Sequence, residues 1–396
     1  MISAEGDLTS SVDLIVMGAS ARASAFSAIR AGFRPLCFDL FADADTAAHA
    51  IVRKVSSDPQ DLLKQLSELP RLPVIYTGGM ENHPEVLEFA ARHHELWGNG
   101  PDAVQRVRNP SLLQEAIRLA KISYPEWRPS ENPPPPDGTW LLKPLAGVGG
   151  RGITVWTPEQ SDSPTLNEPH FFQKIISGQP CSAVFIAPSA VGDVRFVGMT
   201  RQLVGEPDCH ASQWQWCGNI GPIALPVALE NLIRRFGNVL KWKTGLLGVY
   251  GVDLIITEEG VPFVTEVNPR YPASLEILEH ATGQPLLADH CRCFTSTELP
   301  ETGWNCAHPG EFMGKAIYFA PRDLVITEEL ADPASVSVTE FPVIADLPRP
   351  GTEIRKGEPV CTVFAETFSS EQTYELLKNE LKELSVKLGV GSVRPR

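Results

Sequence analysis

The sequence predicts a multidomain α/β and α+β protein, in which a parallel α/β domain is followed by regions of mixed architecture. Strands alternate with helices from Val12 to Leu96, an order typical of a parallel sheet covered on both faces. From Trp140 onward, closely spaced strands and hairpins replace that alternation. The chain has 396 residues, enough for two or three domains with buried cores. We place the domains at 1–106, 107–290 and 291–396.

Composition and charge exclude several classes of partner. Acidic residues outnumber basic ones 48 to 34, which gives a formal net charge of −14, and no run of lysines or arginines offsets it. Repulsion therefore disfavours binding to long nucleic acids and to anionic membrane surfaces. The 8 cysteines include no Cys-x-x-Cys pair, which argues against a disulfide framework or a structural zinc site. We find no signal peptide and no membrane-spanning run, so we expect a cytoplasmic protein.

The first region contains the strands and helices of the parallel sheet. They are expected over 12–17, 21–31, 35–38, 72–76 and 85–96. Ser20 is the expected N-cap of the first helix, and a helix N-terminus with Ser20 and Arg22 can hold a carboxylate. Ordinary capping beside a surface arginine is the simpler interpretation. A dinucleotide-binding fold is not favoured, because Gly-x-Gly-x-x-Gly does not follow the first strand.

The second region begins with a helix and continues as strands. Asn109-Pro110 is typical of a helix start, and apolar residues follow it at helical spacing. A stiff proline spacer at 133–136 precedes the strands. These are expected over 140–143, 153–156, 171–174, 181–187, 195–199, 249–257 and 261–267, the last two forming a hairpin that turns at Glu258-Glu-Gly260.

The third region ends in a helix. Strands are expected over 315–319 and 359–364, and Ser369-Ser-Glu-Gln372 fits the capping box of a final helix. Gly389 suits the end of that helix. The leucine stripe on the helix comprises Leu377, Leu381, Leu384 and Leu388. We interpret this stripe as packing against the rest of the chain, although it could also support a homodimer.

A glycine-rich hairpin follows the strand that ends at Lys143. The turn contains Gly147, Gly149, Gly150, Arg151 and Gly152. Glycines let the backbone approach a ligand closely and point N–H groups at an anion, while lysine adds a point charge. The turn is not a P-loop, because no Gly-Lys-Ser/Thr follows. Phosphate binding and a plain glycine-rich turn remain equally good interpretations of this segment alone.

Two acids lie in the predicted hairpin. If it turns at Glu259, Asp253 and Glu266 lie nearly opposite each other among apolar neighbours. Burying two carboxylates without a cation is costly, and such oxygen ligands with Asn268 beside them suit Mg²⁺ that bridges nucleotide phosphates. Arg270, just past the strand, can reach a transferred phosphoryl group. Solvent-facing acids with a salt-bridging arginine are the alternative, which the apolar neighbours disfavour.

Together these stretches resemble the ATP-grasp superfamily. Lys143 and the glycine turn resemble its phosphate-covering lid, and the acids with Asn268 and Arg270 resemble its metal and catalytic cluster. Phe172-Gln-Lys174-Ile-Ile176 resembles the linker whose backbone reads adenine, with Gln173 where many relatives have glutamate. The resemblance implies an ATP-grasp domain at 107–290 with a lid at roughly 138–176, a Rossmann-like pre-ATP-grasp domain before it, and a small C-terminal region packing on the core.

The resemblance also implies roles for individual residues. The implied catalytic residues are Arg270 and Lys143, and Asp253, Glu266 and Asn268 would bind Mg²⁺, with Mn²⁺ as an alternative. The implied ATP-binding residues are Lys143, Gly147, Gly149, Gly150, Arg151, Gly152, Gln173, Lys174, Ile176 and Arg108. Ser20 and Arg22 are candidates for substrate binding, because the N-terminal domain of relatives often contributes to the acceptor site.

Relatives in this superfamily mostly activate a carboxylate as an acyl phosphate, which an amine then attacks. We therefore expect an ATP-dependent carboxylate–amine ligase that forms a C–N bond, releases ADP and phosphate, and acts on small-molecule partners. Within the superfamily the chain resembles predicted carboligases distantly related to biotin carboxylase. Such proteins occur in organisms that use tetrahydromethanopterin- and methanofuran-type one-carbon cofactors, so biosynthesis of those cofactors is a candidate pathway.

Three alternatives remain at this point. The chain could be a small-molecule kinase, since some ATP-grasp relatives transfer phosphoryl without ligation. Biotin-carboxylase-like carboxylation fits less well, because Ser274 stands where those enzymes have a bicarbonate-activating glutamate. A non-catalytic nucleotide-binding module is opposed by the intact set of acids with Arg270.

Overall fold

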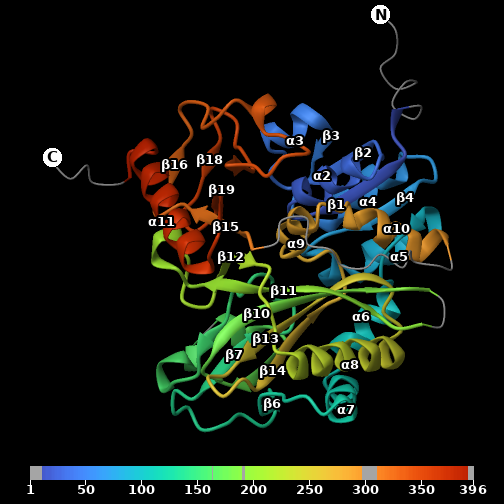
Figure 1. The fold of residues 1–396 in the computed structure, drawn as a ribbon, viewed down its shortest axis with the longest axis vertical. Helices are drawn as coiled ribbons and strands as arrows, with labels where there is room; N and C mark the ends of the chain where they lie inside the picture. Colours follow the sequence, from blue (N-terminus) through green and yellow to red (C-terminus); the bar gives the residue numbers. More distant parts are fainter. Residues whose placement is uncertain (1–10, 163, 190–191, 297–309, 391–396) are drawn as a thin grey trace, which may run out of the picture.

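A five-stranded parallel sheet forms the N-terminal part of the computed structural model, which describes residues 11–162, 164–189, 192–296 and 310–390 (Figure 1). Its strand order is β3-β2-β1-β4-β5, and all four pairings are parallel, as the alternating pattern predicts. The strands are β1 (Leu14–Gly18), β2 (Pro35–Asp39), β3 (Ile51–Lys54), β4 (Pro73–Tyr76) and β5 (Glu95–Leu96). Strand β3 and the helix α4 after it were not predicted.

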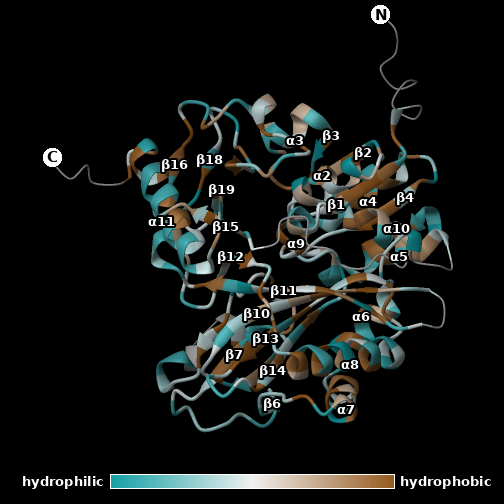
Figure 2. Ribbon diagram, viewed as in Figure 1, coloured by the Kyte–Doolittle hydropathy of each residue, from teal (hydrophilic) through white to brown (hydrophobic). Residues whose placement is uncertain are grey.

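Helices cover both faces of this sheet. They are α2 (Arg22–Arg30), α3 (Ala44–His49), α4 (Pro59–Ser67), η1 (Met80–Asn82) and α5 (Pro84–His93). Leu14 and Val16 of β1 pack in one cluster with α2, whereas Ile15 and Met17 pack in another with α4 and α5. This alternation explains why β1 is apolar at every position (Figure 2). The helix predicted over 85–96 ends earlier, because its last residues pair with β4 as β5.

A second, eight-stranded sheet has the order β14-β13-β10-β11-β12-β15-β19-β17. Its strands are β10 (Gln179–Ala187), β11 (Arg195–Val204), β12 (Trp216–Gly221), β13 (Gly248–Ile256), β14 (Pro262–Asn268), β15 (Phe312–Phe319), β17 (Ile344–Ala345) and β19 (Pro359–Thr367). The C-terminal strands continue the central sheet through the antiparallel pairing of β12 with β15. Gly218 allows this approach, because a Cβ there would lie 2.1 Å from the Lys315 carbonyl oxygen.

A four-stranded sheet, β6-β9-β7-β8, carries the glycine turn. The strands are β6 (Trp127–Pro129), β7 (Trp140–Pro144), β8 (Thr154–Val155) and β9 (His170–Lys174), and η2 (Pro158–Asp162) and η3 (Pro164–Asn167) lie between the last two in sequence. Trp140, Leu142 and Phe172 form its small core. Because this core is separate from those of the larger sheets, the sheet is a distinct layer of the fold (Figure 1).

The remaining helices are α6 (Pro101–Arg108), α7 (Pro110–Ala120), α8 (Val227–Thr244), α9 (Leu275–Thr282), α10 (Leu286–Thr295) and α11 (Ser370–Lys387), with short elements η4 (Pro207–Cys209), β16 (Leu324–Val325), η5 (Pro333–Ser335) and β18 (Glu353–Ile354). The Asn109 side chain accepts from the Ser111 amide at 2.9 Å, and Ser369 accepts from the Gln372 amide at 3.1 Å, so both predicted N-caps are confirmed.

The leucine stripe of α11 faces the interior. Leu377, Leu381 and Leu384 are buried in the same cluster as residues of β15 and β19. The stripe is therefore used within the chain and does not provide a face for a homodimer. In the described part of the chain, none of the helices has the length and apolar character that crossing a bilayer requires.

Candidate active site

The hairpin β13–β14 brings two carboxylates together. Asp253 pairs directly with Glu266 across the strands, which confirms the nearly opposite placement predicted from the position of the turn. The Asn268 side-chain amide donates to one oxygen of Asp253 at 3.0 Å, and Gln202 Nε2 donates to the other at 3.0 Å. Gln202 lies on β11 and had not been predicted as a site residue. A neighbouring strand of the central sheet therefore helps to hold the Asp253 carboxylate in place.

Burial and a neighbouring like charge raise the pKa of Asp253. Burial raises the pKa of the Asp253 carboxyl, the neighbouring Glu266 adds to the effect, and together they bring it to about 6. A divalent cation would relieve this repulsion, and oxygen donors are what Mg²⁺ prefers. Asn268 Oδ1 accepts from Arg270 Nη2 at 3.0 Å, so Asn268 Oδ1 and both Asp253 oxygens each already accept one hydrogen bond. Each of these oxygens keeps a second lone pair that a metal could use. Phosphate and water oxygens would complete its shell. The donor set thus fits Mg²⁺.

Lys143 lies at the end of β7, close to the acids. Its Nζ donates to Gln173 Oε1 at 3.1 Å and lies 5.5 Å from the centre of the Phe171 ring. Burial lowers the pKa of the Lys143 ammonium, and the nearby Glu266 and Asp253 carboxylates oppose that shift. Two stretches separated by more than a hundred residues of sequence therefore share one electrostatic environment.

The glycine turn after β7 is seated against the central sheet. Gly149, Gly150 and Gly152 have φ values of +60°, +80° and +79°, which glycine adopts readily. The Gly149 carbonyl accepts from the Trp216 amide at 3.0 Å, and a Cβ on Gly150 would lie 2.0 Å from the Trp214 carbonyl oxygen. The close approach of two backbones is therefore the reason that Gly150 is glycine.

Arg270 is held by a carboxylate from the N-terminal sheet. Its Nε donates to Glu81 Oε1 at 2.9 Å, and the side chains are 13% and 5% exposed. Burial opposes ionisation of Glu81, but the Arg270 guanidinium outweighs it and keeps the pKa of that carboxyl below its ordinary value. Glu81 was not predicted as a site residue. The available indication was an acid in the segment that follows β4 at the carboxyl edge of the parallel sheet, where ligand sites gather.

The same segment binds Arg108 and the glycine turn. Arg108 donates to the Glu81 carbonyl at 3.0 Å and to Asn82 Oδ1 at 2.7 Å. Asn82 Nδ2 in turn donates to the Ala146 carbonyl at 3.0 Å. Residues 81–82 therefore connect Arg270, Arg108 and the lid, and all three come from different parts of the fold.

A cavity lies between the glycine turn and β14. Apolar side chains including Leu113, Trp127 and Phe171 line part of it. The predicted residues that line it are Arg108, Lys143, Gly147, Gly149, Gly150, Arg151 and Glu266. The predicted ATP-binding, metal-binding and catalytic residues outside the lining are Gly152, Gln173, Lys174, Ile176, Asp253, Asn268 and Arg270. Gln173 is 2% exposed behind Lys143, and the Lys174 side chain donates to Thr139 Oγ1 at 2.8 Å.

Two expectations for the start of α2 are wrong. Ser20 does not cap the helix; Asp39 Oδ2 instead accepts from the Ala21 amide at 2.6 Å. Arg22 is 2% exposed and forms ion pairs with Glu276 and Asp346, both at 2.6 Å. Its guanidinium is therefore occupied inside the protein and is not available to a substrate carboxylate. The partners lie hundreds of residues away in sequence, so local pattern could not reveal them.

Comparison with protein families shows that residues 108–274 match the ATP-grasp domain. An uncharacterized protein of Methanocaldococcus jannaschii is 26% identical over 294 residues, which cover 71% of this chain and 67% of that protein. The carbamoyl phosphate synthase large chain of Neisseria meningitidis is 32% identical over 178 residues, 41% of this chain but only 16% of that protein.

Solved structures resemble nearly the whole chain. An ADP complex of N5-carboxyaminoimidazole ribonucleotide synthetase has a TM-score of 0.67 at 15% identity and covers 96% of this chain and 98% of its own. The biotin carboxylase domain of a Hydrogenobacter thermophilus 2-oxoglutarate carboxylase, with MgADP and bicarbonate, has a TM-score of 0.71 at 13% identity (93% and 89% coverage). An L-amino acid ligase from Bacillus licheniformis has a TM-score of 0.67 at 14% identity (93% and 96% coverage). At these identities the likeness concerns the fold.

Proposed function

Because this chain is a member of the ATP-grasp superfamily, with residues 108–274 as its ATP-grasp domain, we propose that it is an ATP-dependent ligase that joins a carboxylate to an amine. The observation that carries the proposal is that Lys143 and Arg270 both interact electrostatically with the cross-strand pair Asp253–Glu266. A pair of acids near two cations and beside a cavity, with Asp253 half-buried and Glu266 exposed to solvent, suits a nucleoside triphosphate with its metal.

The cavity between the glycine turn and β14 is the proposed ATP site. Lys143 and Arg108 supply positive charge to the phosphates, and apolar side chains supply a surface for the base. Asp253, Glu266 and Asn268 are the proposed ligands of Mg²⁺, which when bound neutralises phosphate charge and lets an anionic nucleophile approach. Lys174 and Ile176 contribute through the linker backbone in this proposal, and Gln173 supports Lys143.

The proposed reaction has two steps. A carboxylate oxygen of the acid bonds to the γ-phosphorus as the bond to the bridging oxygen of ADP breaks. The amine nitrogen then bonds to the acyl carbon, phosphate leaves with the electron pair of its C–O bond, and the amine loses a proton. Arg270 stabilises the charge on the transferring oxygens, and the seated glycine turn keeps water from the acyl phosphate.

The test is a screen for ADP release over amino acids and other small acids and amines, with mass detection of products. The proposal expects ADP and phosphate only when both an acid and an amine are present. AMP and pyrophosphate from that pair would exclude an acyl-phosphate route. A stable phosphorylated product formed without amine would identify a kinase instead.

An Arg270→Ala variant separates a ligase from a nucleotide-binding module. The ligase should lose turnover and keep most of its ATP affinity, because the arginine acts on the transferring group. A binding module has no turnover to lose.

We propose assembly of a tetrahydromethanopterin- or methanofuran-type cofactor as the pathway, supported by the resemblance to predicted carboligases. Acids and amines of that chemistry therefore belong in the screen.

A further inference from the structure

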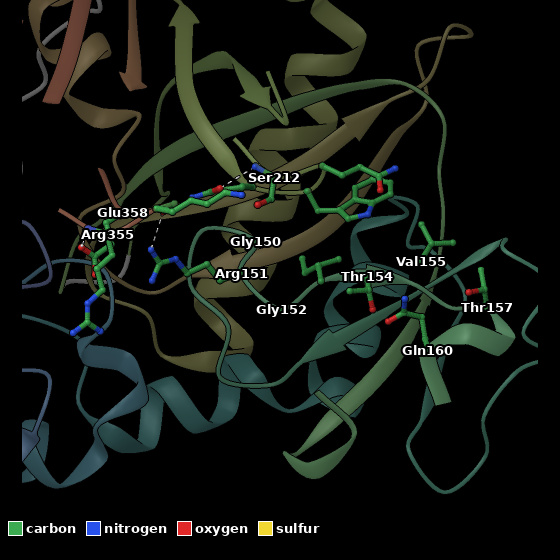
Figure 3. A pocket seen from close by; sticks show the side chains of 16 residues that line it. Gly150, Arg151, Gly152, Thr154, Val155, Thr157, Gln160, Ser212, Arg355 and Glu358 are labelled. Atoms are coloured by element: carbon green, nitrogen blue, oxygen red, sulfur yellow. Dashed lines mark hydrogen bonds between the residues drawn. The ribbon is translucent and has the colours of Figure 1, made fainter. Parts of the chain in front are cut away.

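A large pocket lies on the other side of the glycine turn from the proposed ATP site. Its volume is about 760 Å³, a size common for ligand sites. Gly150, Arg151 and Ile153 line both the pocket and the ATP cavity, so the glycine turn is the wall between them. The other walls come from the loop 212–215 and from the turn 355–358 of the C-terminal region (Figure 3).

Positive charge gathers in this pocket, although the chain carries a net charge of −14. Arg151, Arg355 and Lys356 line it, and all three are exposed. None of the three forms an ion pair with any residue that the structure describes. The one acid among the lining residues is Glu358, and its carboxylate accepts from the Arg355 backbone amide at 2.8 Å. Within the described residues, the pocket therefore presents three cations outside ion pairs against one carboxylate, an excess of positive charge.

Hydrogen bonds hold the C-terminal turn in shape. The Glu358 amide donates to the Arg355 carbonyl at 3.0 Å, and the Lys356 amide donates to Asp323 at 2.8 Å. Gly357 has a φ of +82°, which closes the turn. Arg355 and Lys356 therefore project from a backbone that is already ordered, so binding a ligand would need to order their side chains but not the turn itself.

The glycine turn and the C-terminal turn meet at this pocket. Arg151 Nη2 donates to the Gly357 carbonyl at 3.4 Å (Figure 3). That contact is long and uses one of five N–H donors, which leaves the guanidinium free to bind an anion as well. A ligand in the pocket would then contact both the lid and the C-terminal region.

We propose that this pocket is a binding site for a phosphate or carboxylate group, with Arg151, Arg355 and Lys356 as its ligands. The group belongs either to a substrate that carries a second negative charge or to a free anion. The assignment to a substrate rests on the proposed ligase function; the anion site does not. An anion there joins Arg151 of the lid to the C-terminal turn and so favours the closed lid.

The first experiment measures binding of inorganic phosphate by calorimetry at constant ionic strength. It compares the wild type, the double variant Arg355→Gln/Lys356→Gln, and Lys143→Met, which removes the cation of the ATP cavity. Lys382→Gln, an exposed lysine on α11 outside the pocket, is the matched control. We expect the double variant to bind phosphate about tenfold or more weakly, because two charge-assisted contacts are lost. Lys382→Gln and Lys143→Met should keep this binding event.

The second experiment uses acids that support ADP release. For an acid with a second anionic group, the double variant should raise KM about tenfold and leave kcat within about twofold. Its neutral amide analogue should show no such change. If the double variant loses only phosphate affinity, the site binds a free anion. If the double variant also raises KM for the acid with a second anionic group, the site binds a group of the substrate. If neither measurement distinguishes the double variant from Lys382→Gln, the proposal is wrong. Absence of any ligase activity would overturn the proposed function, but the phosphate titration would still decide the anion site.

Discussion

Glu81 and Arg270 lie 189 residues apart in the chain and form a buried ion pair, with Nε 2.9 Å from Oε1. Arg270 Nη1 also donates to the Tyr271 carbonyl at 3.3 Å and Nη2 to Asn268 Oδ1 at 3.0 Å. A guanidinium has five N–H donors, so two remain for phosphoryl oxygens. Glu81 therefore orients Arg270 without using up its capacity to bind an anion.

Replacing Glu81 with glutamine should reduce turnover more than ATP binding. The Glu81→Gln side chain keeps a hydrogen-bond acceptor but lacks the charge that holds Arg270. We expect kcat to fall about tenfold to a hundredfold, as misplacement of a catalytic group commonly gives, with little change in KM for ATP. Steady-state kinetics of ADP release checks this. Glu85→Gln, an exposed position on α5, should match the wild type. Unchanged kcat in Glu81→Gln would show that Arg270 needs no such partner.

Magnesium binding should weaken as the pH falls below about 6. Burial first, and then Glu266, raise the pKa of Asp253 to about 6, and the cation competes with that proton. The sign for stability is opposite: without metal, the folded state binds this proton more tightly than the unfolded state, so protonation stabilises the fold as the pH falls from about 7 toward 4.

Calorimetric titration of Mg²⁺ in the presence of ADP, at about pH 5 and pH 7.5, measures the competition. Asp253→Asn should bind Mg²⁺ weakly at both values and lose the pH dependence. Glu258→Gln, an exposed residue at the hairpin turn, should retain the wild-type profile. The same pH profile in Asp253→Asn would assign the titration to another group.

Alanine at Gly150 should impair the lid far more than alanine at Gly149. Both residues have positive φ, so both variants carry a backbone cost of about 1–2 kcal/mol. Only at Gly150 would the new Cβ meet the Trp214 carbonyl, at 2.0 Å, whereas nothing lies within 4 Å of a Cβ at Gly149. We expect a large rise in KM for ATP in Gly150→Ala, together with faster proteolysis of the glycine turn. Equal effects in the two variants would mean that the turn is not seated during the reaction.

Glu276→Gln should destabilise the whole protein. Glu276 accepts from Arg22 at 2.6 Å and from Lys315 at 2.8 Å, and all three side chains are buried. Removing the carboxylate leaves Lys315 buried without its ion-pair partner, whereas Arg22 keeps Asp346, and a buried unpaired charge commonly costs about 3–5 kcal/mol of unfolding free energy. Urea unfolding at neutral pH measures it. Glu375→Gln, which breaks an exposed pair on α11, should change stability by less than about 1 kcal/mol.

The ion pairs of Glu276 with Arg22 and Lys315 predict that the stability of the protein is sensitive to acid. Burial opposes ionisation of Glu276, but Arg22 and Lys315 outweigh it and lower the pKa of the carboxyl well below its ordinary value. Its stabilisation is therefore full at neutral pH and is lost as the pH falls below the range where an unfolded glutamate titrates. In Glu276→Gln this part of the acid dependence should disappear.

Several features of the fold could be predicted from interactions between residues close together in the sequence. The approximate pairing of Asp253 with Glu266 followed from the position of one turn. A register shift between Asp253 and Leu254, which the sequence did not predict, makes the two acids direct partners. The caps at Asn109 and Ser369 followed from side chains two or three residues from the amides that they bind. The parallel N-terminal sheet followed from the alternation of apolar strands with helices.

Contacts between distant segments were beyond such reasoning. The amino-acid order specified hairpins, caps and the residue types able to hold a metal and phosphates, since these depend on neighbours along the chain. The tertiary structure determined which distant groups pair. Arg270 forms an ion pair with Glu81, and Arg22 forms ion pairs with Glu276 and Asp346. Asp39 accepts a hydrogen bond from the start of α2, and β12 pairs with β15. A charged side chain shows its sign in the sequence, but the carboxylate that neutralises it is selected by packing in three dimensions, where chain separation carries no information.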